Sequence, residues 1–207
     1  MLTRRELKEK AKQSLNGKYG DAIVVVLLLS IISSVVSFIF KKSFGIPTDV
    51  NQTYSITINL ASFIVSALLN FGYTSFFLKL SRDEDVEVNE LWSKMNMFIP
   101  YIIVSVLISL FTTLWTLLLI IPGIIAALSY SMVYFIMLDN PEMSAMEAIK
   151  ESKKIMNGHK MDYFILQLSF LGWAILGAFT LGILYFWLIP YMEVTYCNFY
   201  NNIKELS

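Results

Sequence analysis

The sequence predicts an all-α polytopic membrane protein. Its composition, its long uncharged stretches and the distribution of its basic residues all support this fold class. Of the 207 residues, 56% are hydrophobic and only 15% are charged. A soluble domain carries about 25% charged residues, so this chain has too little polar surface to cover a water-soluble globule. The formal net charge is zero, which argues against nucleic acid as a partner, because nucleic-acid binding calls for a basic patch.

The N-terminal part predicts a short amphipathic helix followed by a membrane-spanning helix. Thr3 and Glu6 have the spacing of a capping box. The apolar residues 22–40 have a length close to the roughly 20 helical residues that cross a hydrocarbon core. This stretch is longer than the core of a signal peptide, and no small-x-small cleavage motif closes it. We therefore expect a retained signal anchor.

Three further uncharged stretches predict five more spans, six in all. Residues 60–78 give the second span. Residues 97–138 are too long for one crossing, and Pro122-Gly123 is the expected break, because proline removes a helical donor and glycine permits a turn. Residues 163–192 are also too long for one crossing, and we expect their break between Gly177 and Gly182.

The basic residues predict the orientation. With six spans, all of the 16 Lys and Arg residues except Lys41 and Lys42 fall on one side of the membrane. By the positive-inside rule, both termini are then cytoplasmic. The composition, rich in Ile, Lys and Asn, is typical of bacteria, so we expect the bacterial plasma membrane.

An internal repeat predicts a single membrane domain, residues 1–207, built from three related units. Residues 1–80, 81–138 and 139–207 would each form a transmembrane hairpin preceded by a cytoplasmic amphipathic interfacial helix. Asn16-Gly17 and Asp21 match Asn157-Gly158 and Asp162 at the same spacing, and Asn140-Pro141 is the expected start of the third interfacial helix. The alternative is that membrane hairpins resemble one another by composition alone.

Glu193 is the strongest candidate for a ligand site, because charged groups within membrane segments are costly and often functional. It follows Pro190 in the last predicted span. We expect Asn70 and Gln167, within the second and fifth spans, to share a polar network with Glu193. In the alternative interpretation, Glu193 reaches the lipid headgroups or pairs with a lysine, and the two amides only join helices.

Five residues of the interfacial segments are candidates for contact with a partner or with the membrane surface: Leu7, Leu15, Trp92, Met156 and His159. We expect no catalytic residues, cofactor or metal site. With His159 the only histidine and Cys197 the only cysteine, the common zinc sites have too few ligands. Gly-rich phosphate loops and Ser/His/Asp sets are absent from the sequence.

Several segments together resemble one family of bacterial membrane proteins. These segments are Arg5-Glu6-Leu7-Lys8, Gly72-Tyr73 with residues 77–82, residues 118–125, Asp139-Asn140-Pro141 with Ala148-Ile149, residues 157–160, and Pro190-Tyr191 with residues 198–200. The chain is identified as a member of domain-of-unknown-function family 975 over nearly its whole length. The resemblance implies a low-GC Gram-positive host and a distant similarity to the membrane domain of some glycerophosphodiester phosphodiesterases. It implies no activity and no catalytic residues.

Two functions remain open from the sequence. We expect a protein that assists transport or export of a small amphipathic, lipid or peptide ligand, because repeats and polar groups at membrane depth are typical of transporters. The alternative is a non-catalytic scaffold, immunity or envelope-stress factor that binds a protein or lipid partner. Membrane lipids are expected partners in either case, and a homo-oligomer is compatible with both. An enzyme is the least favoured class, since no nucleophile–base or metal set is present.

Overall fold

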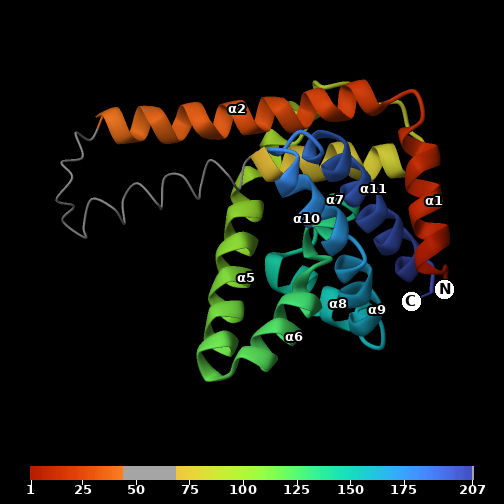
Figure 1. Ribbon diagram of the computed structural model, residues 1–207. Coiled ribbons are helices and arrows are strands. Elements are labelled where there is room, and N and C mark those ends of the chain that lie inside the picture. Colours follow the sequence, from red (N-terminus) through yellow and green to blue (C-terminus); the bar gives the residue numbers. More distant parts are fainter. Residues whose placement is uncertain (44–68, 207) are drawn as a thin grey trace.

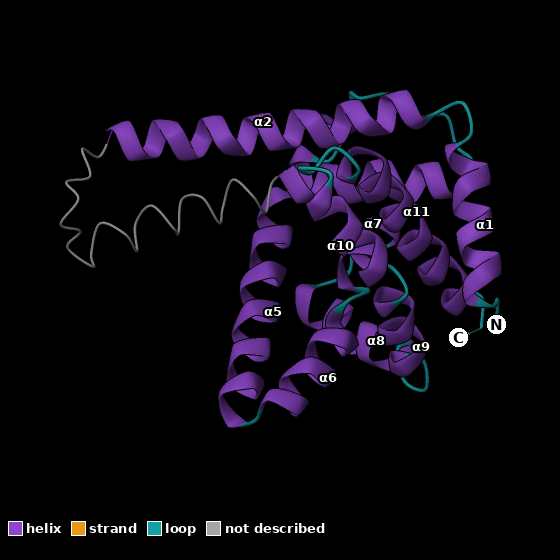
Figure 2. Ribbon diagram, viewed as in Figure 1, coloured by secondary structure: helices purple, strands orange, loops and turns teal. Residues whose placement is uncertain are grey.

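The computed structural model describes residues 1–43 and 69–206, and within these ranges all regular secondary structure is helical (Figures 1 and 2). The all-helical fold class is therefore confirmed for the described part. The predicted loop around residues 41–55 and the first half of the predicted second span lie largely outside the described ranges. The rest of that span belongs to a helical segment at residues 69–81.

The first helix begins where its sequence predicts. α1, Arg4–Leu15, is started by a capping box in which the Thr3 amide donates to Glu6 Oε2 at 2.7 Å and the Glu6 amide donates to Thr3 Oγ1 at 3.3 Å. Gly17 has a φ of 79°, a conformation that glycine adopts without strain. It redirects the chain into α2, Tyr19–Ser43.

The middle of the chain contains two short helical elements and then three helices in succession. They are α4 at Glu90–Ser93, η1 at Met95–Met97, α5 at Phe98–Leu118, α6 at Ile120–Tyr130 and α7 at Val133–Asp139. α5 and α6 pack against each other and form a V in Figure 1.

The break between α5 and α6 lies at Leu119, whose backbone is extended with φ −161° and ψ 143°. The predicted break at Pro122-Gly123 was therefore misplaced. Pro122 falls in the first turn of α6. Backbone N–H groups in a first turn have no acceptor within the helix, so proline removes no helical hydrogen bond there. Gly123 is buried, and a Cβ at this position would collide with Thr116 of α5, so glycine permits the close approach of the two helices.

The predicted start of the third interfacial helix was also wrong. α8, Ala145–Ile155, begins after Ser144, whose side chain forms a capping box with Glu147. Asn140 instead ends α7, and its side-chain amide donates to the Ile136 carbonyl at 3.0 Å. A Ser-x-x-Glu pair satisfies two backbone donors reciprocally, which the Asn140-Pro141 pair does not do.

The C-terminal part consists of α9 at Lys160–Leu168, α10 at Leu171–Phe179 and α11 at Tyr185–Lys204. α9 and α10 are separated by a short kink at Ser169 and Phe170. The turn from α10 to α11 contains Gly182 at φ 87°, within the region where the sequence predicts a break.

Four helical stretches of the described part are long and apolar enough to cross a membrane: Tyr19–Ile39, Phe98–Leu118, Ile120–Asp139 and Lys160–Phe179. These stretches support a helical membrane protein. α11 is not among them, because Glu193 and its asparagines, from Asn198 onward, make it more polar. The predicted count of six and the arrangement in three hairpins stay predictions.

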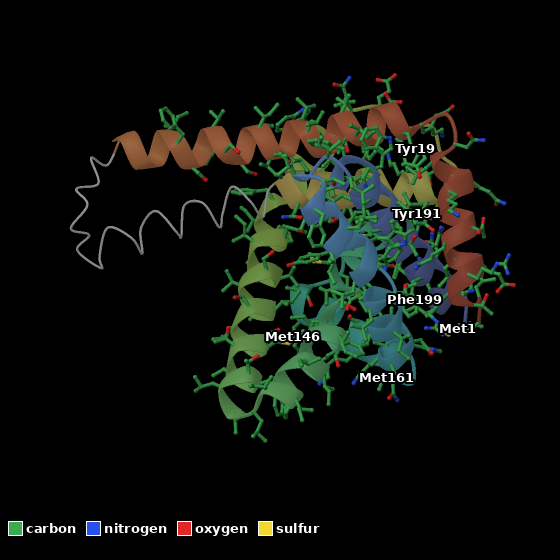
Figure 3. The ribbon with its side chains drawn as sticks, viewed as in Figure 1. Met1, Tyr19, Met146, Met161, Tyr191 and Phe199 are labelled. Carbon is green, nitrogen blue, oxygen red and sulfur yellow. The ribbon has the colours of Figure 1, made fainter. Side chains whose placement is uncertain are left out.

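The hydrophobic core lies where α1, α7, α8 and the second half of α11 meet the segment at residues 69–81. Leu7, Ala11 and Leu15 cover one face of α1 and are at most 1% exposed. Tyr19 and Tyr191 lie beside the corner between α1 and α2 (Figure 3). In contrast, the last turn of α5 and the turn after α10 expose apolar side chains, such as Leu117 and Leu181. Exposed apolar side chains of this kind suit contact with lipid.

Both chain ends lie at the same end of the molecule (Figure 1). The Leu2 amide donates to Asn202 Oδ1 at 2.9 Å, and the Asn198 side-chain amide donates to the Leu7 carbonyl at 3.5 Å. α1 therefore runs antiparallel along α11.

Candidate functional site

Glu193 lies on α11, which packs against α1, α2 and α10. Its side chain is partly buried, and the next two residues, Val194 and Thr195, are fully buried. Among the described residues, no Lys, Arg or His forms an ion pair with Glu193. Glu90 and Asp139 differ in this respect, because both of these shielded carboxylates are paired with cations.

Three tyrosines from three segments lie around the Glu193 carboxylate. The Tyr73 side chain, from residues 69–81, lies close enough to interact with it. Tyr163 on α9 and Tyr196 on α11 lie close enough for its charge to act on their hydroxyls. The rings of Tyr163 and Tyr196 pack edge to face, with 5.6 Å between centroids. We refer to Glu193, Tyr73, Tyr163 and Tyr196 as the Glu193 cluster.

The two amides predicted to share a network with Glu193 occupy different surroundings. The Gln167 side chain interacts with the Tyr163 hydroxyl, which connects Gln167 to the Glu193 cluster. Asn70 is exposed one turn before Tyr73, and its backbone carbonyl accepts a hydrogen bond from Thr74 Oγ1 at 2.8 Å. Its membership in the network stays a prediction.

The sequence singled out Glu193 but not the tyrosines around it. One signal for them was present: Tyr73 and Tyr196 both lie in aromatic and hydroxyl-rich stretches near the cytoplasmic ends of predicted spans. Such residues are ordinarily assigned to the aromatic belt at the membrane surface. Only the packing of the three segments shows that these rings converge on a carboxylate.

The comparisons with known proteins identify the family. The family described as Protein of unknown function (DUF975) matches residues 1–127 and 116–207, which together span the whole chain. The chain belongs to this family. No curated protein and no solved structure gives a significant match. The DUF975 description assigns no activity, so the function of the Glu193 cluster has to be argued from its geometry.

Three of the five predicted contact residues lie in the core of this DUF975 protein. Leu7, Leu15 and Met156 are at most 1% exposed. A charged substitution at any of them would disrupt the core, so their predicted contact with a partner cannot be tested in that way. Trp92 on α4 is 50% exposed and is available for contact with a lipid or a protein.

Neither His159 nor Cys197 belongs to a group of metal ligands in the part of the chain that the structure describes. His159 directly precedes α9 without forming a side-chain cap, and its Nδ1 atom lies 3.8 Å from Asp162 Oδ2, beyond hydrogen-bonding distance. Cys197 is buried on α11. In the described ranges, no three His, Cys, Asp or Glu side chains are grouped as metal ligands.

A second polar cluster lies at the end of the molecule that holds both termini. Asp139 accepts two hydrogen bonds from the Arg82 guanidinium, both at 2.8 Å, one from Lys204 at 2.6 Å and one from Tyr200 at 2.8 Å. Arg82 also donates to Asn201. The Asp139 side chain is 9% exposed, and its oxygens are already bonded. We therefore assign this cluster a structural role.

Proposed function

We propose that this DUF975 protein binds a small amphipathic cation at the Glu193 cluster and assists its transport or export across the membrane. The observation that supports this proposal is a partly buried carboxylate that has three tyrosines around it and no cationic partner in the described part of the chain. Removing a carboxylate from water without a counterion costs several kcal/mol. A cationic ligand would supply the missing charge.

The chemistry of the cluster favours an organic ammonium group. Aromatic rings attract cations through their negative faces, and a neighbouring carboxylate adds a full negative charge. Tyr73, Tyr163 and Tyr196 could therefore hold an amine-bearing lipid, peptide or small amphiphile beside Glu193. Such a ligand would also match the apolar surfaces exposed by the neighbouring helices.

The proposed membrane arrangement completes this function. We place the protein in the bacterial plasma membrane with six spans in three hairpins and both termini in the cytoplasm. The four apolar stretches and the adjacent chain ends support this arrangement. The similarity of this protein to the membrane domain of glycerophosphodiester phosphodiesterases stays a prediction.

One observation favours the second candidate function, a non-catalytic scaffold. Trp92 is 50% exposed on α4, beside the exposed Ser93. Tryptophan is strongly enriched at the centres of protein interfaces. A protein partner or a second copy of the chain could contact this side chain without involving Glu193.

Ligand-induced stabilisation tests the proposed function. We would measure the thermal unfolding of detergent-purified protein with hexyltrimethylammonium, and with hexanol as its neutral counterpart. We expect the ammonium ion, but not hexanol, to raise the midpoint by about 5 °C at saturating concentration, because a ligand that binds only the folded state stabilises it.

The Glu193→Gln variant should lose this response, because it removes the charge with almost no change in side-chain size. Glu205→Gln is the matched control, since Glu205 is exposed at the end of the same helix. An equal rise in the Glu193→Gln protein, or no rise in the unmodified protein, would exclude Glu193 as an ammonium site.

A further inference from the structure

A basic groove lies between α1 and the kink that joins α9 to α10. It is open to solvent and has a volume of about 490 Å³. Four cationic side chains of α1 line it together with one residue of the kink and one of α11: Arg4, Arg5, Lys8, Lys12, Ser169 and Tyr191. This groove is separate from the residues that form the Glu193 cluster.

Most of the positive charge in the groove is not neutralised. Glu9 is the acidic residue of the lining, and it pairs with Lys12 at 3.6 Å. Within the described ranges, neither Arg4 nor Arg5 forms an ion pair. Three cationic side chains are therefore left facing a groove that contains a single carboxylate.

Lys8 is held at the centre of this arrangement. Its ammonium donates to the Ser169 carbonyl at 3.3 Å and lies 3.9 Å from the centroid of the Phe170 ring. Burial, together with the like charges of Arg4 and Lys12, lowers the pKa of the Lys8 ammonium. An anion in the groove would relieve this repulsion.

The groove adjoins an exposed apolar surface. Leu171 follows the kink directly and is 54% exposed, and Trp187, one turn before Tyr191 on α11, is 51% exposed. The rings of Phe170 and Tyr191 pack at 5.5 Å and connect the basic side of this region to the apolar side. A molecule that fits both parts must carry an anionic head and an apolar tail.

We infer that the groove binds the phosphodiester headgroup of an anionic phospholipid from the cytoplasmic leaflet. Arg4, Arg5 and Lys8 would contact the phosphate, and the acyl chains would extend over Leu171 and Trp187. Basic pockets beside membrane helices on the cytoplasmic side bind such headgroups elsewhere. An acidic protein would match the charges but not the adjoining apolar surface.

Native mass spectrometry of the full-length protein in detergent tests this inference. We would add equal amounts of phosphatidylglycerol and phosphatidylcholine with identical acyl chains. We expect phosphatidylglycerol adducts to dominate, and the Arg4→Gln/Arg5→Gln variant to weaken phosphatidylglycerol binding by about tenfold or more. Raising the salt concentration should weaken binding to the unmodified protein, because both arginines are exposed.

The control is Lys153→Gln/Lys154→Gln, which removes the same charge from exposed positions at the end of α8. It should keep the preference for phosphatidylglycerol, and so should Glu193→Gln, which separates this inference from the proposed function. Equal adducts of the two lipids, equal loss in both double variants, or no effect of salt would overturn the inference. Displacement of the lipid by millimolar inorganic phosphate would show a site for free phosphate instead.

Discussion

At the scale of single residues, Glu90 shows how one carboxylate joins separate segments. It accepts hydrogen bonds from Lys79 at 2.8 Å, Ser75 at 2.7 Å and Ser93 at 2.7 Å. Two of these donors lie on residues 69–81 and the third on α4. Burial opposes ionisation of Glu90, but these hydrogen bonds prevail and lower its pKa below the ordinary 4.5.

The lowered pKa predicts acid sensitivity. Because the carboxylate is more acidic in the folded state, its contribution to stability is complete above pH 4.5 and is lost as the pH falls through the folded-state pKa. At neutral pH, Glu90→Gln should reduce the free energy of unfolding by about 1–3 kcal/mol, because it removes charge-assisted hydrogen bonds. Thermal unfolding between about pH 7 and pH 3 measures this difference.

The difference between Glu90→Gln and the unmodified protein should shrink toward the acidic end of this range. Glu87→Gln is the control, since Glu87 is exposed in the loop just before α4, and it should behave like the unmodified protein throughout. A destabilisation by Glu90→Gln that is the same at every pH would rule out ionisation of Glu90 as the cause.

At the scale of elements, the packing of α5 against α6 depends on a glycine. The backbone at Gly123 lies so close to Thr116 that an added Cβ would collide with it. We expect Gly123→Ala to destabilise the protein by about 1–3 kcal/mol, the usual cost of overpacking. Gly172→Ala in α10 is the matched control, because a Cβ there meets no atom within 4 Å.

Thermal unfolding of the two alanine variants distinguishes packing from helix propensity. Alanine favours a helix over glycine by about 1 kcal/mol, so Gly172→Ala should be neutral or slightly stabilising. If Gly123→Ala were equally neutral, α5 and α6 could separate at no cost, and the close contact at Thr116 would not contribute to stability.

Elements were predicted well from the sequence where a local rule decides the outcome. The capping box at Thr3 and Glu6 sets the start of α1. The errors occurred where two local signals competed. Asn140-Pro141 resembles a helix start, but Ser144 and Glu147 satisfy more backbone groups, and Pro122 fits inside a first turn as well as in a break.

At the scale of the whole molecule, the contacts that matter most join distant parts of the chain. Asp139 holds Arg82 and Lys204 together, and Glu193 is near Tyr73 and Tyr163. A periodic pattern indicates which face of a helix is buried, but not which other helix covers it. For this reason Glu193 could be predicted as a candidate from its unusual position, whereas the tyrosines around it could not.

The predicted count of six spans is most open to test in the third hairpin. α10, Leu171–Phe179, contains 9 residues and extends about 14 Å at 1.5 Å per residue, less than half of a hydrocarbon core of about 30 Å. To complete a crossing, it has to be continued by α9 through the kink at Ser169 and Phe170. The alternative is a hairpin that enters the membrane and returns on the same side.

Cysteine labelling in cells distinguishes these arrangements. In a Cys197→Ala background, we would introduce Leu181→Cys in the turn after α10, where Leu181 is 94% exposed, and Ser144→Cys and Leu206→Cys at exposed positions near the expected cytoplasmic side. If six spans are correct, a membrane-impermeant maleimide should label Leu181→Cys in intact cells and the other two only after permeabilisation.

If Leu181→Cys is protected while Leu206→Cys remains internal, the third hairpin does not cross the membrane, and the orientation of the termini holds with fewer spans. If Leu206→Cys is labelled in intact cells, the C-terminus is external and the prediction from the basic residues is wrong.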